Sequence, residues 1–266
     1  MRLTVYQVDA FSSAAFKGNP AGVCITQEAL DAGLMRSIAA EMAVSETAFL
    51  SLETMTLRWF TPKVEVNLCG HGTLAVAHIL KENAIVAMDE TVVFNTLSGA
   101  LSVTIHKDTI DMDFPAASVN FDVVHNKEIL SLLGIKPEQV MAYGRFDVKD
   151  FIEVDSEATL LNLTPDFSGL AQIAGRGVVV TTKSANHELD FICRYFAPWV
   201  GVNEDPVTGS AHCALAVYWG EKLAKSKLKA YQASARGGFV DMECLPNNRV
   251  KLIGRAVTVL KGTLFV

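Results

Sequence analysis

The chain has 266 residues, half of them hydrophobic, and its 29 acidic and 23 basic residues give a net charge of −6. A chain of this size and composition can bury a large core and form two domains of ordinary size. Its acidic balance provides no cationic surface for a nucleic acid or an anionic membrane, so neither partner is expected.

The N-terminal segment MRLTVYQVDAF alternates apolar and polar residues, as a strand does, and lacks the continuous apolar run of a signal peptide. No later segment reaches the length of a membrane span. The five cysteines show no paired spacing, which favours free thiols over a disulfide framework. The sequence therefore predicts a cytoplasmic protein.

Apolar runs rich in β-branched residues predict strands in both halves of the chain. They are residues 3–11, 91–105 and 110–114 in the first half and residues 176–182, 189–197 and 249–254 in the second.

Three helices are predicted, of two kinds. Residues 28–42 predict a surface helix, because one helical stripe collects its apolar side chains, Leu34, Met35, Ile38, Ala39 and Met42. The helices that begin near Gly70 and Gly209 are apolar on all sides, which is typical of a helix enclosed by other elements. A sheet wrapped around each of these two helices would enclose both.

The chain contains an internal repeat. Residues 58–67, RWFTPKVEVN, recur as residues 194–203, RYFAPWVGVN, with an offset of 136 and six identities in ten positions. With an offset of 139, Gly70 matches Gly209. We therefore expect two similar lobes, residues 1–117 and 118–266, with the C-terminal strand free to pack on the first lobe, and a ligand cleft between the lobes.

Both enclosed helices begin at a glycine-rich turn that carries reactive or hydrogen-bonding side chains. These are Cys69, His71 and Thr73 around Gly70, and Thr208, Ser210 and His212 around Gly209. The first N–H groups of a helix lack internal partners and carry partial positive charge, so two such helix starts would hold a carboxylate and stabilise a carbanion beside it.

Glu46, in the segment AVSETAFL, is the candidate base. Its apolar neighbours predict a desolvated carboxylate with a raised pKa, suited to taking and returning a proton. For an arbitrary glutamate, the start of a strand is the simpler interpretation. Likewise, NEDPVTGSAH, which contains Asp205, is by itself a helix start with acidic residues, and FKGNPAGV, which contains Asn19, is by itself a turn.

Six motifs occur in an order that resembles the PhzF-like phenazine biosynthesis family: GNPAGV, SETAF, FTP, CGHGT, EDPVTGSAH and QASARGG. The resemblance covers nearly the whole chain. It implies an α+β fold of two pseudo-symmetric lobes, each a β-barrel around a central helix, related to diaminopimelate epimerase and proline racemase. It also implies a homodimer and a cofactor-free isomerase that acts on a small molecule between its lobes.

The motifs carry the family's site residues onto this chain. The resemblance implies that Glu46 is the acid/base and that His71 and Asp205 take part in catalysis. The implied substrate-binding residues are Asn19, Ser45, Cys69, Gly70, Gly72, Thr208, Gly209 and Ser210. We expect a carboxylate-bearing substrate and no metal, and the sequence does not identify the substrate.

Four other functions or sites compete with this interpretation. An amino-acid epimerase with two thiols would need a second cysteine at position 208, since 69 + 139 = 208, and this residue is Thr208. A zinc site of Cys69, His71, His212 and Cys213 is disfavoured by its spacing. A thiol hydrolase is disfavoured because residues two apart on a helix do not face each other. A carboxylate-binding protein without catalysis stays open.

Overall fold

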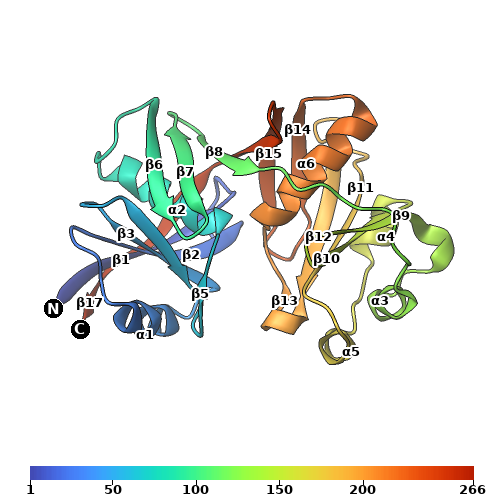
Figure 1. Cartoon of the computed structure of the whole chain (residues 1–266), viewed down its shortest axis with the longest axis horizontal. Coiled ribbons are helices and arrows are strands. Elements are labelled where there is room, and N and C mark those ends of the chain that lie inside the picture. Colours follow the sequence, from blue (N-terminus) through green and yellow to red (C-terminus); the bar gives the residue numbers. More distant parts are fainter. The chain divides into compact units, whose positions relative to one another are not determined.

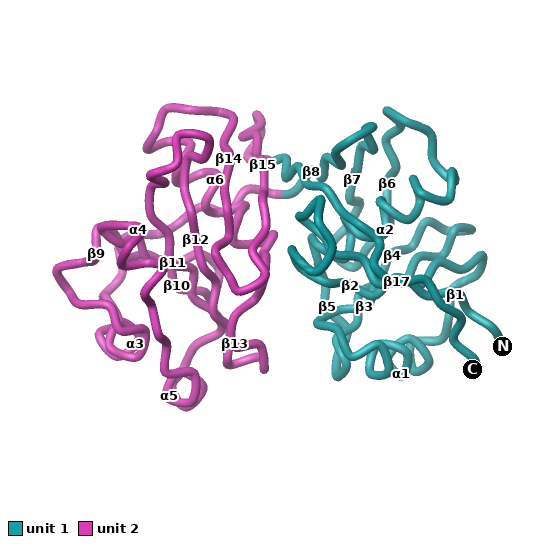
Figure 2. Tube along the Cα trace, turned by 180° about the vertical axis from the view of Figure 1, so that it is seen from behind, with its two compact units in different colours: residues 1–114, 251–266 teal, residues 115–250 magenta.

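The computed structural model describes all 266 residues, which form two compact units. The first contains residues 1–114 and 251–266, and the second contains residues 115–250 (Figure 2). The boundary therefore falls at 114/115 rather than at 117/118, and the C-terminal segment belongs to the first unit. No helix has the length and apolar character that crossing a bilayer requires.

The first unit is mostly strand (Figure 1). Its strands are β1 Arg2–Ala10, β2 Asn19–Thr26, β3 Glu46–Ser51, β4 Thr56–Phe60, β5 Glu65–Val66, β6 Glu90–Thr96, β7 Gly99–Ile105, β8 Ile110–Pro115 and β17 Ala256–Phe265. Its helices are α1 Ala32–Met42 and α2 Gly70–Glu82.

The second unit has the same character. Its strands are β9 Val140–Phe146, β10 Lys149–Val154, β11 Val178–Lys183, β12 Phe191–Ala197, β13 Val202–Glu204, β14 Lys227–Gln232 and β15 Gly238–Leu245, and β16 Arg249–Gly254 crosses the unit boundary. Its helices are α3 Lys127–Leu133, α4 Glu157–Leu161, α5 Phe167–Gln172 and α6 Gly209–Leu223, with two 3₁₀ turns, η1 Pro137–Gln139 and η2 Pro198–Val200. The fold class is α+β, as the sequence predicted.

The strands of the two units pair in the same order and sense. In the first unit β1–β2 is antiparallel, β2–β3 parallel, β3–β4 and β4–β5 antiparallel, and β4–β6 parallel. In the second unit β9–β10, β10–β11, β11–β12, β12–β13 and β12–β14 repeat this series. The internal repeat predicted from the sequence is therefore a repeat of topology.

An arginine–glutamate pair marks the equivalent place in each unit. Arg58 binds Glu65 through Nε and Nη2, each at 2.7 Å, and Arg194 binds Glu204 through Nε at 2.8 Å and Nη2 at 3.1 Å. Both guanidinium groups also lie over a phenylalanine ring two residues further on. A two-pronged pair of this kind fixes the strand geometry more tightly than a single contact does.

The two central helices are buried, as predicted. Nine of the thirteen residues of α2 are buried, and α2 packs against β1, β2, β3, β7 and β17. Helix α6 buries most of its N-terminal half and packs against β14 and β15. The outer helix α1 buries Met35, Ile38 and Ala39 on the predicted stripe.

Two local predictions were wrong. Helix α1 begins at Ala32 rather than at residue 28, because the Asp31 carboxylate caps it by accepting from the N–H groups of Gly33 and Leu34. The segment interpreted as a turn contains the start of a strand: Asn19 and Pro20 open β2, and Pro20 lies opposite Asp9 of β1.

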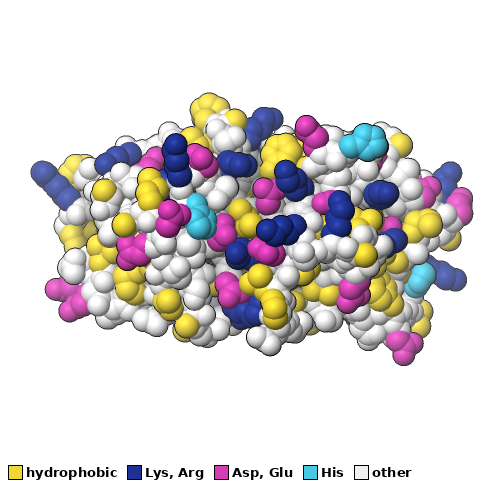
Figure 3. Space-filling view, turned by 90° about the horizontal axis from the view of Figure 1, so that it is seen from above, with side chains coloured by type: hydrophobic (Ala, Val, Ile, Leu, Met, Phe, Trp, Pro, Cys, Tyr) yellow, Lys and Arg dark blue, Asp and Glu magenta, His cyan; other side chains and the backbone are white.

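Acidic and basic side chains are interspersed on the face shown in Figure 3. No large region of that face carries basic residues alone. This distribution agrees with the acidic net charge and gives no support to a nucleic-acid surface.

Candidate functional site

A carboxylate, an imidazole and a thiol meet at the start of α2. Glu46 is the first residue of β3, Cys69 is the N-cap of α2, and His71 is the second residue of that helix. Glu46 Oε2 lies 3.2 Å from His71 Nε2, and Cys69 Sγ lies 3.5 Å from His71 Nδ1. The sulfur also lies 3.8 Å from Nε2, so the imidazole bridges the carboxylate and the thiol.

The contact between Cys69 and His71 overturns one argument made from the sequence. Residues two apart do not face each other within a helix, but Cys69 lies outside it in an extended conformation, with φ −144° and ψ 104°. Its sulfur turns back over the first turn and accepts from the N–H of Gly72 at 3.4 Å. The spacing argument against a cysteine–histidine pair was therefore wrong.

Burial and charge act in opposite directions on this pair. Burial raises the pKa of the Cys69 thiol, although His71 opposes the shift. Burial by itself would lower the pKa of His71, but the sulfur of Cys69 and the carboxylate of Glu46 raise it well above its ordinary value. The carboxylate of Glu46, 3.2 Å from the ring, thus favours the protonated form of the imidazole.

The remaining candidates of the first unit surround this cluster. Ser45 Oγ lies 3.3 Å from His71 Nε2, and Gly70 is the first residue of α2. Gly72 is tightly enclosed, because a Cβ there would lie 2.9 Å from Trp59 Cδ1 and 3.0 Å from Cys69 Sγ. Asn19 is fully buried at the start of β2.

The candidates of the second unit form a separate network at the start of α6. Thr208 donates its hydroxyl to Asp205 Oδ2 at 2.5 Å. Gln232, which is fully buried, donates to the carbonyl of Asp205 at 2.7 Å and accepts from the N–H of Thr208 at 2.9 Å. Asp205 is thus held from two sides, just before the helix that begins at Gly209.

Sequence reasoning missed two residues of this network. Gln232 is the first residue of the QASARGG motif, so a signal for it was present. Lys149 extends its Nζ to within 3.3 Å of Ser210 Oγ. Lys149 opens β10 as Asn19 opens the equivalent β2, so the repeat, followed to the strand starts, could have indicated it.

His212 and Cys213 are core residues of the second unit. His212 Nδ1 donates to the carbonyl of Thr208 at 2.8 Å, and burial lowers the pKa of this histidine to about 4. A neutral histidine and a buried thiol give α6 an apolar interior. The metal-ligand atoms that do lie together are those of Glu46, Cys69 and His71, all within 4.8 Å of one another, and this trio could hold a metal ion.

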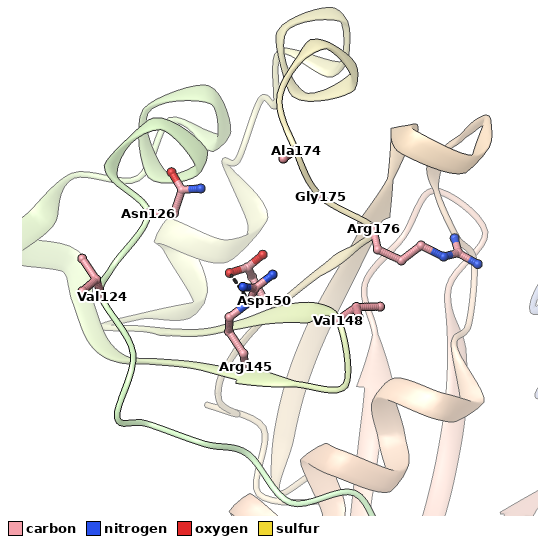
Figure 4. A pocket seen from close by; sticks show the side chains of 8 residues that line it. All are labelled: Val124, Asn126, Arg145, Val148, Asp150, Ala174, Gly175 and Arg176. Carbon is pink, nitrogen blue, oxygen red and sulfur yellow. Dashed lines mark ion pairs between the residues drawn. The ribbon is translucent and has the colours of Figure 1, made fainter.

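A cavity of about 420 Å³ lies elsewhere in the second unit and contains none of the predicted site residues (Figure 4). It is lined by Val124, Asn126, Arg145, Val148, Asp150, Ala174, Gly175 and Arg176. Arg145 Nε lies 3.5 Å from Asp150 Oδ1, and the Arg176 side chain points away from that pair.

The fold and the site define a duplicated α+β protein with a carboxylate, an imidazole and a thiol at the start of one central helix and a carboxylate network at the start of the other. Comparison with known proteins places the chain further. Residues 8–262 match the family model described as phenazine biosynthesis-like protein. The chain belongs to this PhzF family.

Relatives and solved structures agree with this placement. An uncharacterized isomerase of Halalkalibacterium halodurans is 49% identical, with all of both chains covered. The crystal structure of a PhzF family protein from Enterococcus faecalis has a TM-score of 0.92 and 39% identity over all of both chains. A probable proline racemase from Agrobacterium radiobacter shares the fold, with a TM-score of 0.64 and 13% identity over 99% of this chain and 92% of that one. The chain is an isomerase.

Proposed function

We propose that this isomerase moves a proton on a small, carboxylate-bearing substrate without a cofactor, and that Glu46 is the acid/base. The observation that carries the proposal is the bridge from Glu46 through His71 to Cys69. A carboxylate positioned beside an imidazole with a raised pKa is a proton donor and acceptor pair of the kind that general acid–base catalysis needs.

The reaction would begin at a C–H bond next to the carboxylate or a conjugated group. Glu46 takes the proton, and the electron pair of that bond delocalises into the substrate as an enolate-like anion. The imidazolium of His71 stabilises the negative charge that develops. Return of the proton from Glu46 to a different carbon completes the isomerisation, so no net atom or electron leaves the substrate.

Asp205 has a supporting part in this proposal. Its carboxylate accepts from Thr208, and its carbonyl accepts from Gln232, so the group is rigid before a substrate arrives. A carboxylate that is already fixed can orient a hydroxyl or amino group of the substrate without a further loss of side-chain conformational entropy.

Glu46→Gln tests the proposal. Glutamine keeps the size and hydrogen-bonding capacity of the side chain but cannot exchange a proton near neutral pH, so incorporation of solvent deuterium into the substrate should fall about a hundredfold or more. The substrate would be found by screening small carboxylates for protein-dependent deuterium uptake in heavy water, monitored by NMR.

Cys69→Ser is the matched control, because serine retains a hydrogen-bonding group at the N-cap of α2 but offers no thiolate. We expect a mild effect. If instead Cys69→Ser is inactive and Glu46→Gln is active, the chemistry belongs to the thiol. If the wild type binds carboxylates but exchanges no proton with any of them, the chain is a binding protein.

The metal-free state, the homodimer and the cytoplasmic location remain predictions. Elemental analysis that found one zinc per chain would overturn the first, since Glu46, Cys69 and His71 offer three ligand atoms. A mass that stays that of a monomer at all concentrations would overturn the second, and cell fractionation tests the third.

A further inference from the structure

The side chains of Glu46, Cys69 and His71 have the separations of ligands around one metal ion. Glu46 Oε2 lies 3.2 Å from His71 Nε2, and Cys69 Sγ lies 3.8 Å from the same nitrogen. Around a tetrahedral zinc ion, bond lengths of about 2.0–2.3 Å place nitrogen and oxygen ligands about 3.4 Å apart and nitrogen and sulfur ligands about 3.6 Å apart. The observed separations differ from these values by about 0.2 Å, which small side-chain adjustments absorb.

The chemistry of the three ligands selects the kind of ion. Thiolate, imidazole and carboxylate are the usual protein ligands of zinc. A thiolate is a poor ligand for Mg²⁺ and Ca²⁺, which prefer oxygen. Three protein ligands leave the fourth tetrahedral position open for water or another small ligand. The trio therefore suits a borderline divalent cation such as Zn²⁺ and not a hard one.

Two of the three ligands are held in place by the start of α2. Cys69 and His71 are buried, and the Cys69 carbonyl accepts from the N–H and the hydroxyl of Thr73 at 3.0 and 2.8 Å. The N–H of Gly72 donates to Cys69 Sγ at 3.4 Å, and hydrogen bonds of this kind orient a metal ligand. The Glu46 side chain is 22% exposed, so an ion can reach the trio from solvent past this carboxylate.

The second unit has no such set of ligands at the equivalent place. The register of β3 with β4 and of β11 with β12, together with the offset of 139 at the helix starts, matches Gly177 with Glu46, Thr208 with Cys69 and Ser210 with His71. None of these three second-unit residues is a usual zinc ligand. The duplicated fold by itself therefore does not produce the trio, and one site per chain is expected.

We propose that Glu46, Cys69 and His71 form a site for one divalent cation of the zinc type, and that an ion bound there inhibits the isomerase. Coordination replaces the proton of the Cys69 thiol and uses the lone pair of a neutral His71 ring. The ion also occupies the carboxylate of Glu46, which then cannot take a proton from a substrate. The binding rests on the geometry of the trio, and the inhibition rests on the proposed function. The metal-free chain is the active form, and zinc supplied to it is a reversible inhibitor rather than a cofactor.

Cobalt(II) is the probe for binding, because it enters tetrahedral zinc sites and is coloured. Titration of the reduced, chelator-treated full chain with Co²⁺ should produce the intense visible absorption of a tetrahedral ion and a near-ultraviolet sulfur-to-cobalt charge-transfer band. Both should saturate at one ion per chain. Added Zn²⁺ should abolish them by displacing the cobalt, whereas added Mg²⁺ should leave them unchanged.

Variants of the ligands test the assignment. Cys69→Ser should lose the charge-transfer band, and its dissociation constant for Co²⁺ should rise about tenfold or more. Glu46→Gln should keep the band, because the sulfur remains, but bind Co²⁺ more weakly. His106→Gln is the matched control, because His106 lies 2.7 Å from Asp89 and 3.5 Å from Asp111 in a group that includes no thiol. It should bind Co²⁺ as the wild type does.

Inhibition is measured with the substrate that the deuterium screen identifies. Saturating Zn²⁺ should lower deuterium incorporation by the wild type about tenfold or more, because Glu46 is occupied, and EDTA should restore it. At the same zinc concentration, Cys69→Ser should keep most of its own zinc-free rate.

The site is overturned if the wild type gives no charge-transfer band, if Cys69→Ser gives the same band, or if His106→Gln loses it. The inhibition is overturned if the zinc-loaded wild type exchanges protons at its full rate. These failures are distinct from a failure of the proposed function. Cobalt binding is measured without turnover, whereas the acid/base proposal fails if metal-free Glu46→Gln retains proton exchange.

Discussion

At the scale of single residues, the pKa values of the two central histidines, His71 and His212, shift in opposite directions, and their local sequences do not indicate this. His71 lies one residue after Gly70 and His212 lies three residues after Gly209, both in the first turns of their helices, yet the pKa of His71 is raised and that of His212 is lowered. The difference is the partner: His71 faces a carboxylate, whereas His212 faces the carbonyl of Thr208 and the thiol of Cys193 in a fully buried site.

His212 makes acid stability a testable property. Its folded pKa is about 4, below the ordinary value near 6.5, so below pH 6.5 the unfolded chain binds the additional proton. Stability should therefore fall as pH falls from about 6.5 to 4, by about 3 kcal/mol from this residue. Denaturant unfolding at pH 7 and pH 4.5 measures the loss.

His212→Asn should reduce that loss, because an asparagine amide can still donate to the Thr208 carbonyl but does not titrate. His187→Asn is the control, since His187 is exposed. If the wild type and His212→Asn lose the same stability between pH 7 and pH 4.5, groups other than His212 determine the loss.

The site residues that the sequence identified are those that stand in a motif. Glu46, His71 and Asp205 stand in three of the six motifs. Glu46 and His71 lie at element starts and Asp205 lies between β13 and α6, each in contact with other polar groups. Lys149 stands in no motif, and its approach to Ser210 depends on the β9–β10 hairpin meeting α6. Contacts between segments 61 residues apart in the chain cannot be seen in either segment alone.

At the scale of elements, the repeat offers matched sites in one molecule. Arg58 pairs with Glu65 alone, but Arg194 also donates Nη1 to the carbonyls of Leu160 and Leu163, at 3.3 and 3.0 Å. The Arg194 guanidinium therefore ties β12 to the segment around α4 as well as to β13. The same residue type at equivalent positions has a larger structural part in the second unit.

Replacing each arginine by methionine should measure that difference. Arg194→Met leaves Glu204 and two carbonyls without their donor, so we expect a loss of about 3 kcal/mol. Arg58→Met leaves one partly exposed carboxylate, so we expect about 1 kcal/mol. Denaturant unfolding midpoints of the two variants measure these losses of stability. Equal losses in both variants would contradict the structural argument.

Element boundaries were harder to predict than elements. The central helices and seven of the seventeen strands, β1, β6, β7, β8, β11, β12 and β16, follow from apolar periodicity, because burial on one or all sides constrains composition. Strand β2 was missed because Gly18, Asn19 and Pro20 are turn formers by composition. Pro20 is nevertheless compatible with a strand start, where the β1 partner does not need its missing N–H.

At the scale of the whole molecule, the sequence repeat and the compact units do not coincide. After β16, the chain continues as β17, which pairs with β1 of the first unit along nine positions from Arg2–Phe265 to Ala10–Ala256. After β8, the equivalent segment enters the second unit, where Asn120 forms a bridge with Arg145 of β9. The last segment of each repeat thus pairs with strands of the other repeat. No periodicity in the sequence indicates this exchange.

This exchange makes the first unit depend on the end of the chain. Ending the chain after Arg255 removes β17 and leaves β1 with β2 as its strand partner from Val5 to Ala10 only. Loss of the β17 ladder and its side-chain packing should cost the first unit on the order of 5 kcal/mol, since each inter-strand hydrogen bond contributes about 1 kcal/mol. Hydrogen exchange of the amides of β1 would register the loss, while β10 and β11 in the second unit should keep their protection.

Leu260→Ala is the control for this truncation, because it changes a side chain that is 48% exposed and leaves the backbone ladder of β17 in place. Its exchange pattern should match that of the wild type. If the truncated chain protects β1 as well as the wild type does, the C-terminal strand is not part of the first unit's cooperative core. If protection is lost equally in β1 and in β10–β11, the two units unfold as one, and the exchanged segments join them into a single cooperative structure.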